Sequence, residues 1–141
     1  MKERISIFLY DLKRKKFLLF INKNSLEPQI VIELKKGEEN TYKDLGLKIK
    51  NIIGINPDEI FSLNWGGVYK VDNEEFKQIN YLAFVSLKNS HIKNKIGKIK
   101  LLSIKDLLNE ISWNDNKDLL KRVLTKAINR EVYFDKKERG Q

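Results

Sequence analysis

Apolar residues recur along this chain in two patterns that alternate. Short runs rich in β-branched and aromatic residues, separated by polar turns, predict β-strands. Stretches in which apolar residues recur every three or four positions predict amphipathic helices. The predicted strands span residues 5–10, 16–21, 29–34, 60–71, 76–87 and 96–102, and the predicted helices run from Thr41 to Ile53, from Ser103 to Ile111, and from Asn114 or Asp115 to Ile128.

Local signals at the ends of these elements support that division. The polar residues 11–15 join the first two strands as a hairpin. Thr41 is a typical N-cap for the first helix, and Gly54 is a typical residue to end it. The pair Gly66-Gly67 predicts a bulge or a bend in the fourth strand, and residues 72–75 predict a turn before the fifth.

The order of the elements predicts the fold class. Three strands are followed by one helix, three more strands and two helices. Residues 81–85 are almost continuously apolar, which is typical of a strand covered on both faces. Helices on both faces of a mixed sheet would bury this strand and the apolar stripes of the helices. We expect an α/β/α sandwich with a mixed sheet and two C-terminal helices in residues 1–131, and a charged tail at 132–141.

Composition narrows the chemistry that the chain could perform. Its 141 residues include no cysteine and one histidine, which excludes disulfides, thiolate nucleophiles and cysteine-ligated metal sites. Because 41% of the residues are hydrophobic, the chain can form a folded core. No apolar run has the length of a membrane helix, and residues 5–10 are too short for a signal peptide. We expect a soluble, cytoplasmic protein with no membrane partner.

Positive charge exceeds negative charge, with 28 lysine and arginine residues against 19 acids. The cations gather in residues 13–16, in residues 88–105 and in the last helix. The second of these segments contains six lysines and no acid. Such clusters favour polyanions, so nucleic acid is a candidate partner of Lys88 to Lys105. The solvent-facing side of a strand, or a general lysine bias of the proteome, explains the same pattern without a partner.

The order of elements resembles that of the Nudix hydrolase family. In that family a signature segment follows the third strand and continues into a helix that ends at a glycine. Residues 37–55, GEENTYKDLGLKIKNIIGI, stand in the same place. The end of the chain is also similar, because residues 103–108 and 112–114 precede a long apolar helix. The resemblance extends over residues 1–131 and implies a Nudix-like α/β/α sandwich.

The family signature reads G-x5-E-x7-R-E-U-x-E-E-x-G-U, where U is a bulky apolar residue. Aligned on Gly54-Ile55, it places Glu39 at the first acid and Ile49 at the internal apolar position. The remaining positions of the signature fall on Glu33 for the opening glycine, Leu47-Lys48 for Arg-Glu, and Asn51-Ile52 for Glu-Glu.

Three of these positions decide the metal chemistry. Residues 48, 51 and 52 are spaced i, i+3 and i+4, so they share one face of a helix. The resemblance implies three carboxylates there, which in the family hold Mg²⁺ against the substrate phosphates and so activate a water. Here the face offers an ammonium, an amide and an alkyl group. The sequence predicts a degenerate metal site, with Mg²⁺ a cofactor only if the protein is catalytic.

Four residues are candidates for a metal or phosphate site. Glu39 matches a family acid and is the candidate catalytic residue, and Glu33, Glu38 and Glu39 could together rebuild a metal site. Compensation of the helix dipole for Glu39, and ordinary surface charge for Glu33 and Glu38, are the simpler explanations of these acids. Lys48 could contact a phosphate in place of the missing metal, or could be an exposed helix lysine.

Aromatic residues near the glycine pair are candidates for ligand contacts. Trp65 and Tyr69 could stack on a base, and core or edge packing explains them at least as well. Glu74 and Glu75, which we place in a turn, and His91, in a lysine-rich loop, carry no specific signal.

Three functions follow as hypotheses. The first is a Nudix-fold protein that is weakly active or inactive and binds a nucleotide or another phosphate-bearing partner. The second is an active Nudix-type pyrophosphohydrolase of a nucleoside diphosphate-linked substrate, using the relocated acids Glu33, Glu38 and Glu39. The third is a basic RNA- or DNA-binding α/β protein unrelated to that family. The uncharged and cationic groups at positions 48, 51 and 52 favour the first.

Overall fold

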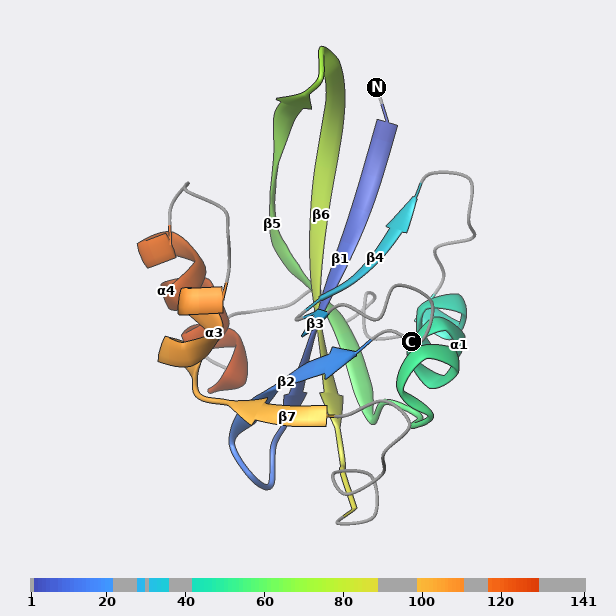
Figure 1. Cartoon of the computed structure of the whole chain (residues 1–141), viewed down its shortest axis with the longest axis vertical. Helices are drawn as coiled ribbons and strands as arrows, with labels where there is room; N and C mark the ends of the chain where they lie inside the picture. The colour runs from blue at the N-terminus through green and yellow to red at the C-terminus, as the bar shows by residue number, and fades with distance from the viewer. Residues whose placement is uncertain are drawn as a thin grey trace.

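Strand β1, Lys2–Asp11, lies at the centre of the sheet in the computed structural model of this chain. The structure describes residues 2–21, 28–29, 31–35, 42–88, 99–110 and 117–129. Within these residues, seven strands form one mixed sheet (Figure 1). The other strands are β2 (Lys16–Ile21), β3 (Pro28–Gln29), β4 (Val31–Lys35), β5 (Glu59–Val71), β6 (Glu74–Val85) and β7 (Ile99–Leu102).

The two edges of β1 have different neighbours. On one edge β1 runs parallel to β6 along its whole length, and β6 pairs in turn with β5. On the other edge β1 pairs antiparallel first with β4 and then, at Tyr10 and Asp11, with β2. Strand β2 continues away from β1 and pairs with β3 and β7. Two branches of the sheet therefore diverge from the same edge of β1.

Alternation along the central strands creates two buried faces. In β1, Phe8 and Tyr10 belong to one core cluster, whereas Ile7 and Leu9 belong to the other. Residues of β6 divide in the same way, with Leu82 and Phe84 in the first cluster. This two-sided burial explains why the sequence of β6 is nearly continuous in apolar residues rather than alternating.

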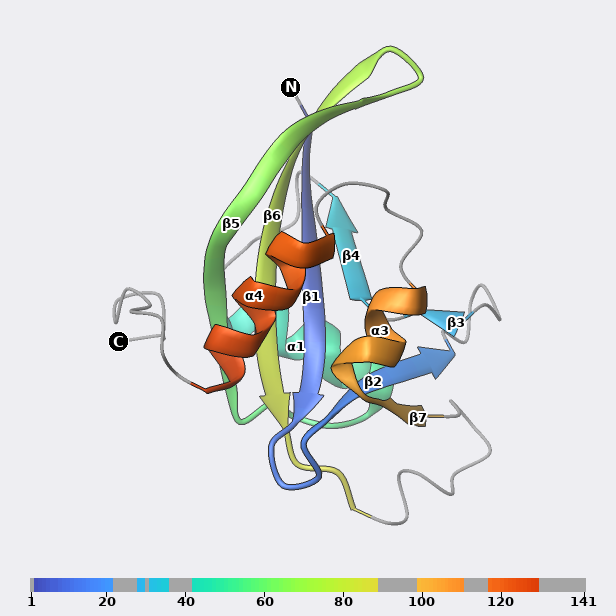
Figure 2. The same cartoon turned by 90° about the vertical axis from the view of Figure 1, so that its left-hand side faces the viewer.

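Helices cover both faces, as Figures 1 and 2 show. Helices α3 (Ile104–Glu110) and α4 (Lys117–Ile128) cover the Phe8 face, to which they contribute Leu107, Leu120 and Leu124. Helix α1 (Tyr42–Ile53) covers the opposite face with Leu45 and Ile49. The predicted α/β/α sandwich with a mixed sheet and two C-terminal helices is confirmed.

Strands β5 and β6 form a long hairpin whose turn differs from the predicted one. The turn consists of Asp72 and Asn73, whose φ angles are 51° and 66°. Two successive residues with positive φ are typical of a type I′ turn, which matches the twist of the flanking strands. Glu74 and Glu75 already pair with Val71 and Lys70, so the prediction of a turn over 72–75 was wrong for these two residues.

The structure also tests the predicted bounds of two strands, the irregularity in β5 and the cap of α3. The predicted third strand is divided into β3 and β4, which have different partners, and the predicted strand 96–102 is described from Ile99. Strand β5 does contain a bulge, but it lies before the predicted position: the register shifts between Ser62 and Gly66, whereas Gly66 and Gly67 pair with Ile79 and Gln78. Ser103 caps α3 as expected, since its Oγ accepts a hydrogen bond from Asp106 N at 3.2 Å. No helix in the described part of the chain is long and apolar enough to cross a membrane.

A buried carboxylate fixes the end of the hairpin between β1 and β2. The Asp11 side chain is fully buried and accepts hydrogen bonds from Arg14 N at 3.1 Å, Arg14 Nη1 at 2.9 Å and Leu87 N at 3.2 Å. Arg14 Nη1 also donates to the Leu87 carbonyl at 2.6 Å. The Asp11–Arg14 pair therefore ties the β1–β2 loop to the chain that leaves β6.

Tyr10 gives the fold a testable dependence on alkaline pH. Its ring is buried, with ring centroids 4.8 Å from Phe17 and 6.1 Å from Phe84. Burial raises the pKa of the Tyr10 phenol above its ordinary value of 10.0, and the Asp11 charge raises it further. The folded protein therefore keeps this proton to a higher pH than the unfolded chain does.

We expect the free energy of unfolding to fall as the pH rises above the ordinary tyrosine pKa of 10.0, because unfolding then releases the Tyr10 proton. Below that pH the phenol is protonated in both states and its contribution is constant. Urea unfolding across a pH series should show a shallower alkaline fall for Tyr10→Phe than for the wild type. Parallel curves for the two proteins through the alkaline range would contradict this assignment.

Candidate functional site

The sequence places the candidate phosphate and metal chemistry on α1, and the packing of that helix fixes which face is available. Leu45 and Ile49 are fully buried against the sheet. The helix ends at Gly54, whose φ of 79° lies in the left-handed region that glycine adopts readily. Gly54 N donates to Lys50 O at 2.7 Å and so satisfies one of the last carbonyls of the helix. This confirms the predicted C-terminus of the helix.

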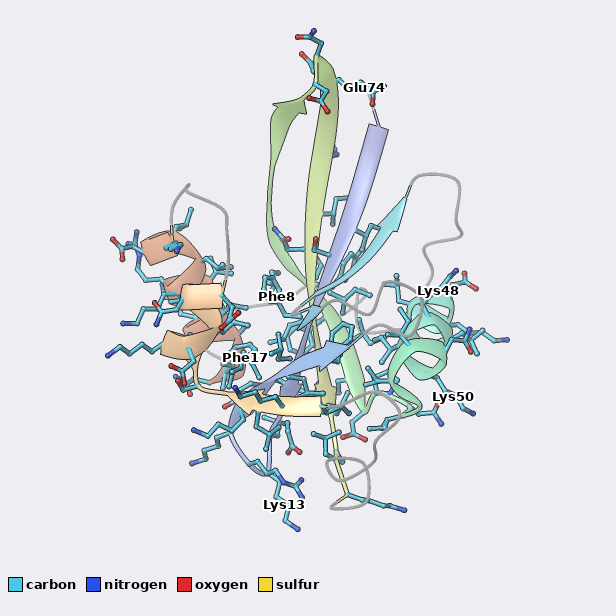
Figure 3. All side chains as sticks on the ribbon, in the orientation of Figure 1. Phe8, Lys13, Phe17, Lys48, Lys50 and Glu74 are labelled. Carbon is cyan, nitrogen blue, oxygen red and sulfur yellow. The ribbon has the colours of Figure 1, made fainter. Side chains whose placement is uncertain are left out.

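The helix face formed by residues 48, 51 and 52 is partly buried against the core. Ile52 is half-buried and packs against the core cluster beneath α1. Lys48 is half-buried, and Asn51 is exposed. Figure 3 shows Lys48 and Lys50 at separate positions on α1. The part of this face that solvent reaches is therefore provided chiefly by one lysine and one amide.

A row of polar residues crosses the centre of the sheet, and the sequence analysis did not identify it. Ser6 of β1 pairs with Asn80 of β6 on one side and with Glu33 of β4 on the other. Ser6 and Asn80 are each only 1% exposed. Each is two residues from a member of the Phe8 cluster on the same strand, so both lie on the same face as that cluster, opposite α1. A polar residue inside each of two strongly apolar strands was the signal available in the sequence.

The candidate residues of β4 and β5 lie near the two ends of this row. Trp65 falls in the bulge of β5 that lies opposite Asn80, and β4 and β5 are separated by β1 and β6. Three strand spacings place the backbones of Glu33 and Trp65 about 14 Å apart. Tyr69 lies further along the hairpin, paired with Phe76. These residues do not form one compact cluster with Lys48, which lies on the α1 side of the sheet.

The remaining candidates cannot be placed in the same way. Glu38, Glu39 and His91 fall outside the described residues. Glu33, Trp65 and Tyr69 have described backbone positions, and their roles in metal binding and base stacking stay predictions.

Comparison with known proteins bears on the fold. The sequence matches no protein-family model and no curated protein. Among solved structures, the binary complex of a Caenorhabditis elegans Ap4A hydrolase matches with a TM-score of 0.58 and 15% identity, over 92% of this chain and 99% of that chain. A Nudix hydrolase from Nitrosomonas europaea has a TM-score of 0.57 and 10% identity, over 94% of this chain and 92% of its own.

A third structure, from Listeria monocytogenes and assigned as a Nudix hydrolase, has a TM-score of 0.57 and 11% identity, over 93% of this chain and 96% of its own. This chain has the Nudix fold. The coverage of both partners is nearly complete, so the likeness concerns the whole architecture rather than one shared motif. At these identities it establishes the fold, and function has to be argued from the residues of the site.

A divalent metal does not fit the helix face where the Nudix resemblance places it. Mg²⁺ prefers several oxygen ligands, mainly carboxylates, in octahedral geometry. Of the three residues on this face, Lys48 is positively charged like the ion, Ile52 is an alkyl side chain packed against the core, and Asn51 supplies one neutral oxygen. Within the described ranges, no group of three or more histidine, cysteine, aspartate or glutamate side chains is arranged to hold a metal.

Proposed function

We propose that this protein uses the Nudix fold to bind a nucleotide or another phosphate-bearing partner without metal-dependent hydrolysis. The observation that carries the proposal is the α1 face, where Lys48, Asn51 and Ile52 occupy the positions of the three family carboxylates. An ammonium group there would repel Mg²⁺ and attract phosphate oxygens. The half-buried setting of Lys48 strengthens this attraction relative to a fully solvated lysine.

Binding of a phosphate and its hydrolysis make different demands on the site. A Nudix-type hydrolase needs the metal to polarise the phosphate and to activate the attacking water. A fixed lysine can neutralise phosphate charge, but a protonated amine cannot supply a metal-bound hydroxide. We therefore infer that ligand binding survives on this fold where the hydrolytic step does not.

We expect Lys48→Gln to weaken the binding of ADP or ADP-ribose about tenfold, the loss typical of one charge-assisted contact to phosphate. Isothermal titration calorimetry in EDTA would measure the dissociation constants. Lys50→Gln is the matched control, because Lys50 lies on the same helix, is exposed and points to a different side. Equal affinities of the wild type and both variants, or no binding by any of them, would contradict the role of Lys48.

A second measurement tests the absence of hydrolysis. Pure protein incubated with Mg²⁺ or Mn²⁺ and nucleoside diphosphate derivatives is expected to give no more product than a boiled control. Turnover above that control would overturn the proposal. If Glu39→Gln then abolished the turnover, the alternative of a relocated acid cluster with Glu33 and Glu38 would be supported instead.

A further inference from the structure

Two lysine-rich segments that are distant in sequence meet at one end of the molecule. The clasp of Asp11, Arg14 and Leu87 holds the β1–β2 loop against the segment that follows β6. Lys88, which is exposed, comes directly after this contact. The clasp therefore joins the cations of residues 13–16 to the beginning of the basic segment 88–105.

The C-terminal end of the same basic segment, residues 99–105, approaches the same place through the sheet. Phe17 of β2 pairs antiparallel with Leu102 of β7. Lys16, which precedes Phe17, and Ser103, which follows Leu102, are therefore at the same end of this strand pair. Exposed Lys105 follows at the start of α3. Figure 3 shows Lys13 at this end of the molecule, far from Glu74 at the tip of the β5–β6 hairpin.

The loop presents its charges from a fixed backbone. Lys13 and Lys15 are exposed and Lys16 is half-buried, whereas the Arg14 guanidinium is engaged by Asp11. Lys15 has a φ of 57°, in the left-handed region that residues with a Cβ rarely adopt. Glycine or asparagine would adopt this conformation more easily, so a lysine here points to a use for its charge.

The described acids at this end are engaged elsewhere or lie on other elements, apart from Asp11, which pairs with Arg14 of the loop. Asp11 is occupied by Arg14, and Asp58 accepts a hydrogen bond from Ser86 Oγ at 2.6 Å. Exposed Asp106 follows Lys105 on α3. Residues 12–16 contain four cations and no acid. The surface is therefore dominated by ammonium groups on separate elements.

We propose that this cationic end, formed by Lys13, Lys15, Lys16, Lys88 and Lys105, binds the phosphodiester backbone of nucleic acid. Several ammonium groups held apart on a firm backbone suit a ligand with repeated phosphate charges. This surface is separate from the α1 face, so the proposal goes beyond nucleotide binding at Lys48 and does not depend on it.

The observations favour nucleic acid over an anionic membrane. A membrane-binding loop combines basic residues with apolar side chains that insert among the lipids. In the described part of the chain, Leu12 and Leu47 are the exposed large hydrophobic residues, and Leu12, 38% exposed, is the one on this loop. A single half-covered leucine adds little insertion energy to the electrostatic attraction.

The test removes three charges from the loop and compares the result with the same change elsewhere. The loop variant combines Lys13→Gln, Lys15→Asn and Lys16→Gln, with asparagine chosen because it tolerates the positive φ. The matched variant combines Lys117→Gln, Lys121→Gln and Lys126→Gln, three exposed positions on α4. Thermal unfolding by circular dichroism confirms that both fold. Fluorescence anisotropy with a labelled oligouridylate, repeated across a salt series, measures affinity.

We expect the loop variant to bind about tenfold more weakly at low salt and its slope of log affinity against log salt to shrink by about 2, the value for three lost phosphate contacts. The α4 variant should retain the wild-type affinity within about twofold, because it loses the same net charge without losing the contacts. Equal weakening of both variants, or no oligonucleotide binding by the wild type, overturns the proposal. Tighter binding to phosphatidylserine vesicles than to the oligonucleotide, reduced by Leu12→Ser, also overturns it in favour of a membrane surface.

Discussion

Asp11→Ala is expected to lower the free energy of unfolding by about 3 kcal/mol, the range for breaking a buried ion pair on one side. The Asp11 carboxylate is fully buried, whereas the Arg14 side chain is 25% exposed. Losing the carboxylate therefore removes the countercharge of a partly buried guanidinium, which still donates to the Leu87 carbonyl. It also leaves Leu87 N without its acceptor. Urea unfolding followed by circular dichroism would measure the change.

The matched control for this prediction is Asp58→Ala. Asp58 is exposed and accepts one hydrogen bond from Ser86, so we expect a cost below about 1 kcal/mol. The double variant Asp11→Ala/Arg14→Gln should recover part of the loss, because it removes the uncompensated charge as well. If Asp11→Ala costs no more than Asp58→Ala, the clasp does not stabilise the fold as we infer.

Phe84→Ala is expected to cost about 4 kcal/mol, in the range for emptying a fully buried aromatic site. Phe84 is the second-to-last residue of β6 and is fully buried. Its ring contacts Phe61 edge-to-face at a centroid distance of 5.0 Å and lies 6.1 Å from the Tyr10 ring. The substitution removes both ring contacts and leaves a cavity beneath α3 and α4.

A conservative substitution at the same position provides the comparison. Phe84→Leu keeps most of the apolar volume, and we expect it to cost about 1.5 kcal/mol. Denaturant titration of the two variants should therefore give clearly separated midpoints with similar slopes. Equal midpoints would show that the site collapses around the smaller side chain, contrary to the close packing described above.

The elements of this fold follow from local patterns in the sequence. The buried face of α1 was predicted from the stripe of Leu45 and Ile49, and its end from Gly54, whereas the predicted cap Thr41 lies outside the described residues. The Ser103 cap was likewise predicted from a single residue, whereas the irregularity predicted at Gly66-Gly67 lies just before this pair, between Ser62 and Gly66. The sequence prediction was wrong where the local preference for a turn differs from the strand pairing of the fold. Glu74 and Glu75 are polar, and yet they are extended in β6 and pair with β5.

The candidate site was predictable only in part. The absence of carboxylates at positions 48, 51 and 52 is visible in the sequence, because helical spacing alone places these residues on one face. The row of Glu33, Ser6 and Asn80 was not visible, because it depends on the pairing of three strands that are far apart in the chain. Two of its members are also unremarkable polar residues until burial is known.

The sequence by itself determined the helices, the strands and the chemical character of the α1 face, because these depend on residues that are close together in the sequence. Only the tertiary structure decided which strands share an edge of β1, that α1 and α4 cover opposite faces, and that the loop of Lys13 lies beside Lys88. The last of these depends on Asp11 and Leu87, which are 76 residues apart. Such contacts are selected by the packing of the whole domain, so no local pattern records them.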